Sequence, residues 1–431
     1  MTSGSDGSGA ASVAYGTAFA RPGDGIARID RPIDEGRELS LCRRASAPVR
    51  EAVACGTFAG AVTGVLLPDG TTQFEAYGSA VRETGQAMAP DSLFWIASLT
   101  KSMTSTLVLM LVDEGKLALE DPVERHLPEF RGQTVAGWFG KGSRPRRPAM
   151  VADLMRHLSG MPDRVPSEMR PLDRIALAEK ARLCGSLRLV SQPGEKHLYS
   201  NLNYEALGRL IEVASGASFE AFLQERLLDP LGMRDTTFRP MASQLARLAL
   251  PYQTRQAPNT FFAARDGASE RRPFTLVREP FDDAVRQPTP AFGLFSTAED
   301  CLRFCRLHLQ GGERQRRRLF SAGSAELLLK RFDGPPGAES QGLAWSVSPN
   351  AAVITGTMGT WMTLHLRIGV ASVFLSSCAD FWDGPRDVCK RFVGNVGAEV
   401  RAERTAEIRR AADARRASVN RRRRVRQPVE G

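Results

Sequence analysis

The first clear alternation of apolar and polar positions predicts a β-hairpin. Residues 58–67 are apolar and rich in strand-forming types, and residues 72–81 alternate between apolar and polar positions. The turn signal Pro68-Asp69-Gly70 separates the two runs. Two strand-like runs joined by a short turn containing glycine are typical of an antiparallel pair. We therefore expect a hairpin here, with ordered structure beginning near Ala47.

A helical pattern begins at Ser98. Its apolar positions, among them Met103, Leu107 and Leu111, recur at helical spacing, and Gly115 follows where a glycine would end the helix. Later stretches show the same periodicity, or an acidic first turn suited to a helix start. These further helices are expected at residues 151–158, 172–183, 204–214, 219–227, 297–310 and 383–396.

Short strands are expected to return near the end of the chain. Alternating or continuous apolar runs lie at residues 342–347, 352–355, 361–367 and 370–376. A hairpin, a mostly helical block and returning strands predict an α+β fold, in which helices flank an antiparallel β-sheet. The helical block, about residues 99–290, would be an inserted all-helical subdomain. We expect a disordered leader at 1–45, a main domain at 46–397 and an Arg-rich tail at 398–431.

The formal net charge of +10 on these 431 residues is unevenly distributed. Between Arg401 and Arg426 there are eleven arginines and three acidic residues, so the rest of the chain is close to neutral. A near-neutral body argues against a nucleic-acid-binding domain and is typical of an enzyme that acts on small molecules. We interpret the arginine run 421–424 as part of a solvated, disordered tail rather than a site for nucleic acid or anionic lipid.

The cysteine pattern and the composition of the N-terminal residues indicate the cellular compartment. The seven cysteines are scattered and form no C-x-x-C motif, which indicates a reducing environment without a disulfide framework. Residues 1–45 contain no apolar segment of the kind found in a secretion signal, and no run is long and apolar enough to span a membrane. We therefore expect a cytoplasmic protein with no membrane partner. The pattern leaves its oligomeric state open.

Ser98 and Lys101 are the first candidate reacting groups. A serine hydroxyl is a weak nucleophile until another group takes its proton. Lys101 follows three residues later, so one helical turn brings its amine back to the same face. If the amine is desolvated, its pKa falls and it can act as a base or stabilise a tyrosinate. The alternative for Ser98 is a simple helix N-cap.

Tyr199 and Asn201 form a second motif about a hundred residues later. A phenol with a pKa near 10 needs a nearby cation before it can serve as a base, and Lys101 is a candidate for that cation. Asn201 offers a donor and an acceptor that would hold Lys101 or orient an acyl group. The alternative for Tyr199 is an anchoring aromatic.

Six segments in order carry a family resemblance, at residues 94–101, 109–130, 153–161, 193–208, 229–233 and 293–300. They resemble the serine β-lactamase-like and penicillin-binding-protein superfamily, most closely class C β-lactamases and the carboxylesterases related to them. The resemblance covers roughly residues 50–395. It implies a β-lactamase/transpeptidase-like catalytic domain at 46–397, in which Ser98 becomes acylated and then passes the acyl group to water or another acceptor.

The third family motif is altered. The resemblance leads us to expect Lys-Thr-Gly or His-Thr-Gly on a strand beside the nucleophile, whereas the chain has Ile354 before Thr355, Gly356 and Thr357. The amide of Thr357, with that of Ser98, would still form an oxyanion hole, and Thr355 and Gly356 would line the substrate site. A basic group for a substrate carboxylate is missing. This lowers the expectation of β-lactamase or D-alanyl carboxypeptidase activity.

The remaining candidates favour structural roles. Cys301, Cys305 and His308 would share one face of a helix, where packing in a core is expected over metal binding. His157 and His197 flank family motifs and are expected to be structural hydrogen-bonding groups. The sequence contains no G-x-S-x-G, which disfavours the α/β-hydrolase fold. It also contains neither His-Glu-x-x-His nor a phosphate-binding glycine loop, and we expect no cofactor and no metal.

Three functions remain in view. The first is a serine hydrolase, of esterase or acyltransferase type, acting on a small neutral ester or thioester. Its acyl-enzyme would form on Ser98 with the help of Lys101 and Tyr199. The second is β-lactamase or D-alanyl carboxypeptidase-type activity. The third is a non-catalytic binding protein that keeps the fold, which the isoleucine at position 354 leaves open.

Overall fold

The computed structural model describes residues 40–137, 142–163, 172–252, 286–335, 341–376, 378 and 386–425. Most of the predicted leader, and residues 253–285, lie outside these residues. The short helix α1 (Leu41–Ala45) occupies the end of the predicted leader, so ordered structure begins before Ala47.

A seven-stranded sheet forms the centre of the domain, with strand order β3-β2-β1-β11-β10-β9-β8. Every pairing within it is antiparallel. Its strands are β1 (Gly60–Leu66), β2 (Thr72–Val81), β3 (Gln86–Ala87), β8 (Ser346–Val347), β9 (Ala351–Gly356), β10 (Thr360–His365) and β11 (Val370–Ser376). The predicted hairpin is confirmed, because β1 pairs with β2 along its whole length.

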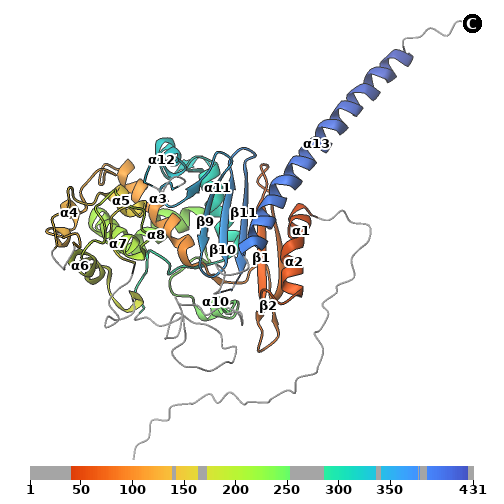
Figure 1. Cartoon of the computed structure of the whole chain (residues 1–431). Helices are drawn as coiled ribbons and strands as arrows, with labels where there is room; N and C mark the ends of the chain where they lie inside the picture. Colours follow the sequence, from red (N-terminus) through yellow and green to blue (C-terminus); the bar gives the residue numbers. More distant parts are fainter. Residues whose placement is uncertain are drawn as a thin grey trace, which may run out of the picture. The chain divides into compact units, whose positions relative to one another are not determined.

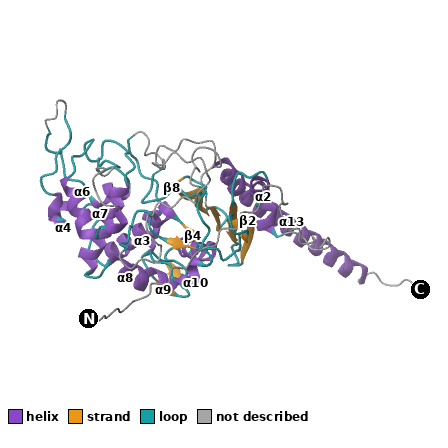
Figure 2. Ribbon diagram, turned by 90° about the horizontal axis from the view of Figure 1, so that it is seen from below, coloured by secondary structure: helices purple, strands orange, loops and turns teal. Residues whose placement is uncertain are grey.

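The central strands β1 and β11 are buried along their whole length because helices cover both faces of the sheet. One face packs against α1, α2 (Ala47–Ala54) and the first turns of α13 (Arg386–Val425). The other packs against α11 (Ala298–Leu309) and, through the main core, against the helical block. Figure 2 shows the sheet between the helical block and the α2–α13 side. The predicted α+β class, a helix-flanked antiparallel sheet, is confirmed.

The helical block follows β3 and the short strand β4 (Phe94–Trp95) in the chain. It lies beside the sheet, at the left of Figure 1. Its helices are α3 (Thr100–Asp113), α4 (Val123–His126), α5 (Val151–Met155), α6 (Leu177–Ser186), α7 (Asn201–Ser215), α8 (Phe219–Leu223), α9 (Asp229–Leu231) and α10 (Ala242–Leu245). After it come the short strands β5 (Phe295–Ser296), β6 (Glu313–Arg314) and β7 (Arg317–Arg318), and helix α12 (Ala322–Leu328).

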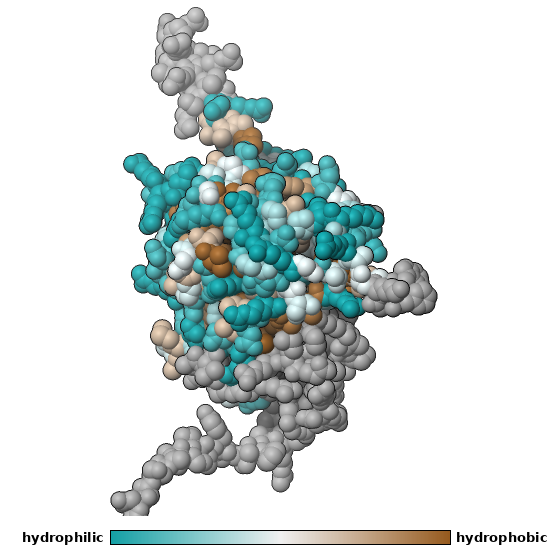
Figure 3. Space-filling view, turned by 90° about the vertical axis from the view of Figure 1, so that its left-hand side faces the viewer, coloured by the Kyte–Doolittle hydropathy of each residue, from teal (hydrophilic) through white to brown (hydrophobic). Residues whose placement is uncertain are grey.

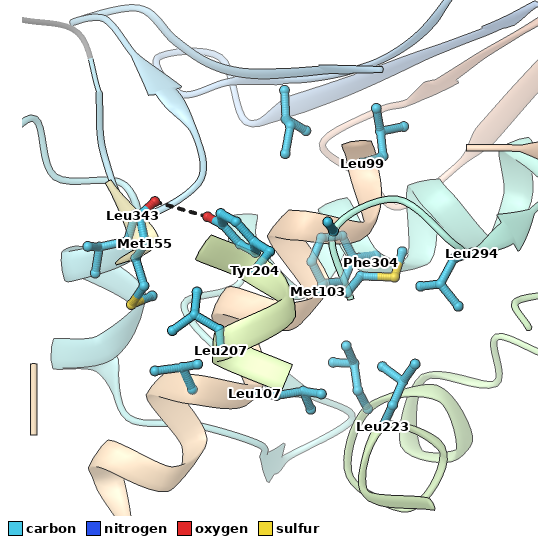
Figure 4. Close-up of a cluster of buried hydrophobic side chains, with 14 of the residues drawn as sticks. Leu99, Met103, Leu107, Met155, Tyr204, Leu207, Leu223, Leu294, Phe304 and Leu343 are labelled. Carbon is cyan, nitrogen blue, oxygen red and sulfur yellow. Dashed lines mark hydrogen bonds between the residues drawn. The ribbon is translucent and has the colours of Figure 1, made fainter. Parts of the chain in front are cut away.

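Helix α3 is buried from Thr100 to Leu111, with polar as well as apolar side chains enclosed. Its apolar side chains Met103 and Leu107 belong to the same core cluster as Leu207 of α7 and Phe304 of α11 (Figure 4). A helix buried on all sides is held by packing around its whole circumference. The outer face of the helical block, in contrast, is mainly hydrophilic with scattered apolar residues (Figure 3).

Several predicted boundaries are wrong. The helix expected at 383–396 continues to Val425, so α13 crosses the expected boundary at 397 and includes most of the predicted tail. Alanine, arginine and glutamate are good helix formers, and no glycine or proline occurs between residues 398 and 425. The helix expected at 172–183 is α6, which begins only at Leu177. The strand expected at 342–347 is only β8. Over the described residues, none of the helices combines the length and apolarity needed to cross a membrane.

Candidate active site

Ser98 lies in a tight turn between β4 and α3. The preceding residue, Ala97, has a φ of +48°, a left-handed conformation that non-glycine residues adopt at a cost in free energy. Strand β4 pairs with β5, and the amide of Ile96 donates to the carbonyl of Leu294 at 3.0 Å. The strained turn is therefore fixed on both sides. Ser98 is only 8% exposed, and a 3-10 turn (Ala97–Leu99) leads directly into α3.

The amine of Lys101 reaches back to the serine, as the three-residue spacing predicts. Its Nζ lies 3.1 Å from Oγ of Ser98. It also contacts Oδ1 of Asn201 at 2.7 Å and the carbonyl oxygen of Ala291 at 2.8 Å. Lys101 is 3% exposed. In its ammonium form the amine donates to all three oxygens, and in its neutral form it donates to Asn201 and Ala291 and turns its lone pair toward the serine hydroxyl.

Burial gives Lys101 the proton affinity of a base. Desolvation lowers the pKa of its amine to about 7, and the negative charges of Asp163 and Glu205 partly oppose this effect. A substantial fraction of the amine is therefore neutral near neutral pH, and a neutral amine is able to accept the serine proton.

Tyr199 contacts the serine from the other side. Its hydroxyl lies 2.8 Å from Oγ of Ser98. Burial of the hydroxyl raises the pKa of Tyr199, and the nearby charge of Asp163 adds to this, while the hydrogen bond to Ser98 opposes it. The residue as a whole is 44% exposed, so the ring reaches solvent even though its hydroxyl points into the site. The pKa of Tyr199 is raised, and the expectation that Lys101 lowers it is wrong, because burial outweighs the contacts that favour the charged phenolate.

His157 positions the tyrosine. Its ring lies 4.4 Å from that of Tyr199, centroid to centroid, at an interplanar angle of 34°. Its Nδ1 lies 3.2 Å from the Ser200 amide, which donates to it, and 3.2 Å from Nδ2 of Asn203. Burial, with Lys101 and His197 nearby, lowers the pKa of His157 well below its usual value. A neutral, accepting imidazole under the tyrosine ring agrees with the structural role expected for His157.

Asp163 is a site residue that the sequence reasoning missed. Its Oδ1 accepts from the amide of Asn201 at 2.8 Å and from the side-chain Nδ2 of the same residue at 3.3 Å. A carboxylate at the first residue of α7 compensates the free amides there and is favoured by the helix dipole. It orients the asparagine amide so that its oxygen faces Lys101. No local motif marks this aspartate, since its role arises only when residues 161–163 fold over the start of α7.

The third motif, Ile354 to Thr357, lies beside the turn that carries Ser98. A Cβ on Gly356 would be 2.7 Å from the carbonyl oxygen of Ile96, and Oγ1 of Thr360 donates to that same oxygen at 2.9 Å. Thr355 and Thr357 are half-buried on either side of this close approach. Ile354 is 6% exposed and belongs to the main core cluster. The position that carries a basic group in the expected motif is therefore filled by an apolar side chain.

The three residues considered and rejected as metal ligands lie in the core. Cys301, Cys305 and His308 are buried in α11, and burial raises the pKa of both thiols. The ring of His308 packs among Phe304, Phe320 and Trp345. Within the described part of the chain, histidine, cysteine and acidic side chains form no group of three that would hold a metal ion.

Comparison with known proteins finds relatives that match most of the chain. Protein Rv1367c of Mycobacterium tuberculosis (strain ATCC 25618 / H37Rv) is 31% identical over 299 residues, which cover 65% of this chain and 70% of that protein. Esterase EstB of Burkholderia gladioli is 30% identical over 336 residues, covering 73% and 80% respectively. The solved structure of EstCE1, a hydrolase with promiscuous acyltransferase activity, superimposes with a TM-score of 0.67 at 22% identity, covering 83% of this chain and 98% of EstCE1.

The family assignment rests on the extent of the match. The Beta-lactamase family model matches residues 47–388, which is well over half of the chain. The matched region contains the Ser98 turn, the Tyr199–Asn201 motif and β9. The resemblance seen in the sequence is therefore confirmed, and the chain belongs to the beta-lactamase family.

Proposed function

We propose that the protein is a serine hydrolase that forms an acyl-enzyme on Ser98, with esterase or acyltransferase activity toward a small neutral ester or thioester. The observation that carries the proposal is the position of Oγ of Ser98, 3.1 Å from Nζ of Lys101 and 2.8 Å from the hydroxyl of Tyr199. A nucleophile within hydrogen-bonding distance of a neutral base is the arrangement that acyl transfer requires.

The reaction follows from these contacts. The neutral Lys101 amine accepts the serine proton as Oγ bonds to the acyl carbon, and the carbonyl electron pair moves onto oxygen. The amides of Ser98 and Thr357 would stabilise that oxyanion. When it collapses, the bond to the leaving alkoxide or thiolate breaks. The leaving group takes the proton of Tyr199, which Lys101 then replaces. Deacylation runs through the same steps in reverse. Water or an alcohol takes the place of the leaving group and attacks the acyl carbon, and its proton passes by way of Tyr199 to Lys101. Lys101 then returns a proton to Oγ of Ser98 as the acyl group is released.

Ile354 supports a neutral substrate. A substrate carboxylate buried next to an isoleucine would lose its hydration without gaining an ion pair. The names of two similar proteins, Esterase EstB and EstCE1, point to ester substrates and, for EstCE1, to acyl transfer. The expected cytoplasmic location agrees with a substrate of intracellular metabolism. β-Lactamase activity and pure binding remain outcomes of the test below.

Covalent labelling tests the nucleophile independently of the natural substrate. A fluorophosphonate should add one probe mass to the intact protein, and Ser98→Ala should take up none. Ser102→Ala is the matched control, because Ser102 is buried one turn along α3 and its hydroxyl donates to the Leu99 carbonyl rather than to the reacting groups. Equal labelling of Ser98→Ala and wild type would refute the assignment, and no labelling of either would favour a binding protein.

Substrate selectivity tests the role assigned to Ile354. We expect p-nitrophenyl butyrate to be hydrolysed with a higher kcat/KM than the p-nitrophenyl monoester of succinate, which carries a free carboxylate. The difference should be about tenfold or more, the size of one lost charge-assisted hydrogen bond. Addition of an alcohol should divert acyl groups to a new ester if the protein is an acyltransferase. Rapid hydrolysis of a penicillin would instead favour the β-lactamase alternative.

A further inference from the structure

A second lysine and a second carboxylate form a fully buried ion pair near the reacting groups. Nζ of Lys180, on α6, lies 2.7 Å from Oε2 of Glu205, on α7, and both side chains are 0% exposed. Neither residue touches Ser98. Desolvation largely offsets the attraction within a buried ion pair, so such a pair is a poor way to stabilise a fold. Its position beside the site therefore points to another role.

The ion pair holds the segment of residues 287–291. Nζ of Lys180 donates to the carbonyl oxygen of Pro288 at 2.7 Å. The other carboxylate oxygen of Glu205, Oε1, accepts from the amide of Ala291 at 3.4 Å. The two members of the pair thus hold the segment at two points, three residues apart.

The same segment contacts α3 and the proposed base. The carbonyl oxygen of Ala291 accepts from Nζ of Lys101 at 2.8 Å, and the carbonyl oxygen of Pro290 accepts from Oγ1 of Thr104 at 2.8 Å. Pro290 also packs directly on α7, because a Cβ on Gly208 would lie 2.3 Å from its ring. The amide of Ala291 contacts Glu205 and its carbonyl contacts Lys101. A shift of the carboxylate would therefore move the acceptor that orients the amine.

Glu205 also acts on Lys101 through its charge. It is one of two carboxylates, with Asp163, whose charge favours the ammonium form of Lys101. The other titratable groups that face the amine are uncharged: the ring of Tyr199 at 4.9 Å, the ring of Tyr204 at 5.5 Å, and the imidazole of His157. Burial raises the pKa of Glu205 itself, and the adjacent Lys180 opposes this effect.

We propose that Lys180 and Glu205 are positioning residues for the base: they fix residues 287–291 so that the Ala291 carbonyl orients the Lys101 amine. This inference rests on the proposed function of Ser98 and Lys101. It assigns a role to two residues that contact neither the substrate nor the nucleophile.

The test compares charge removal at the pair with charge removal elsewhere. Glu205→Gln keeps the shape and an acceptor for the Ala291 amide, but leaves Lys180 as a buried cation and so lowers stability. The double variant Lys180→Met/Glu205→Gln removes both charges, so no unpaired charge is left buried and we expect this variant to fold. Asp300→Asn is the matched control, because Asp300 is a carboxylate only 3% exposed that does not act on Lys101. Each variant is measured for thermal unfolding, for the rate of fluorophosphonate labelling, and for kcat and KM on p-nitrophenyl butyrate from pH 5 to 9.

The labelling rate should fall at low pH, where Lys101 is protonated; we call this fall the acid limb. We expect the acid limb to move to lower pH by about half a unit or more in both pair variants, because loss of a nearby anion makes the ammonium less stable and lowers the pKa of Lys101. The plateau value of kcat should fall about tenfold with little change in KM, the pattern expected when an interaction used in the transition state is lost. The acid limb of Asp300→Asn should stay in place. Pair variants that unfold at lower temperature while their acid limb and plateau remain those of wild type would overturn the positioning role. Failure of wild type to label at Ser98 would instead overturn the proposed function.

Discussion

Nζ of Lys101 lies 3.1 Å from Oγ of Ser98, yet its other two hydrogen-bond partners, Asn201 and Ala291, come from segments 100 and 190 residues further along the chain. The local helix turn brings the two reacting groups together. The distant partners enclose the amine and determine its proton affinity. Predictions about activity therefore concern both the local pair and the distant groups that surround it.

The pH dependence of activity should report on Lys101. Its amine must be neutral to accept the serine proton, and burial lowers its pKa to about 7. Below that pH the amine is protonated, so kcat/KM should fall about tenfold for each further pH unit. Above it, activity should level off. Measuring kcat/KM for p-nitrophenyl butyrate from pH 5 to 9 checks this, and a flat profile through pH 7 would exclude Lys101 as the base.

Replacement of Lys101 should remove the base while leaving the nucleophile in place. We expect Lys101→Met to lower kcat/KM by about 100-fold to 10,000-fold, the usual contribution of a positioned general base. Its fold should persist, since the change removes a buried amine and retains an aliphatic side chain of similar length. Steady-state kinetics and thermal unfolding measure the two effects separately. Activity within threefold of wild type would show that another group takes the proton.

Tyr199→Phe separates the hydroxyl from the ring. The ring should keep its place against His157, whose centroid lies 4.4 Å away, while the hydrogen bond to Ser98 is lost. We expect kcat to fall about 100-fold, because proton delivery to the leaving group is impaired, with stability nearly unchanged. Esters with better leaving groups should be affected less, since they depart without a proton. A uniform loss across a series of leaving groups would contradict this role.

Gly356→Ala tests the close approach of β9 to the turn that carries Ser98. The added Cβ would lie 2.3 Å from Oγ1 of Thr360 and 2.7 Å from the carbonyl oxygen of Ile96, so the strand has to shift. We expect a loss of about 1–3 kcal/mol in the free energy of unfolding, together with a lower kcat. Gly394→Ala, in α13, is the control, because its Cβ would meet nothing within 4 Å. Denaturant unfolding should show that the control is as stable as wild type or slightly more stable.

The local part of the fold was predictable because short-range patterns specify it. The alternation of residues 72–81 and the turn before it predicted the hairpin of β1 and β2, since a period of two with a glycine turn has few other solutions. The helix after Ser98 and its end near Gly115 followed from helical periodicity. Boundaries were less accurate where composition misled, as in α13, whose arginines suggested a disordered tail although they favour a helix.

The spacing of residues identified the candidate reacting groups, because Ser98 and Lys101 are one helical turn apart and the Tyr199–Asn201 motif is a local pattern. The proton affinities and the orientation of these groups depend on the tertiary structure. The lowered pKa of Lys101, the raised pKa of Tyr199, and the contacts of Asp163, Glu205 and Ala291 all depend on segments far apart in the chain. Proton affinity is set by desolvation and by charges in space, and neither can be read from the spacing of residues along a chain.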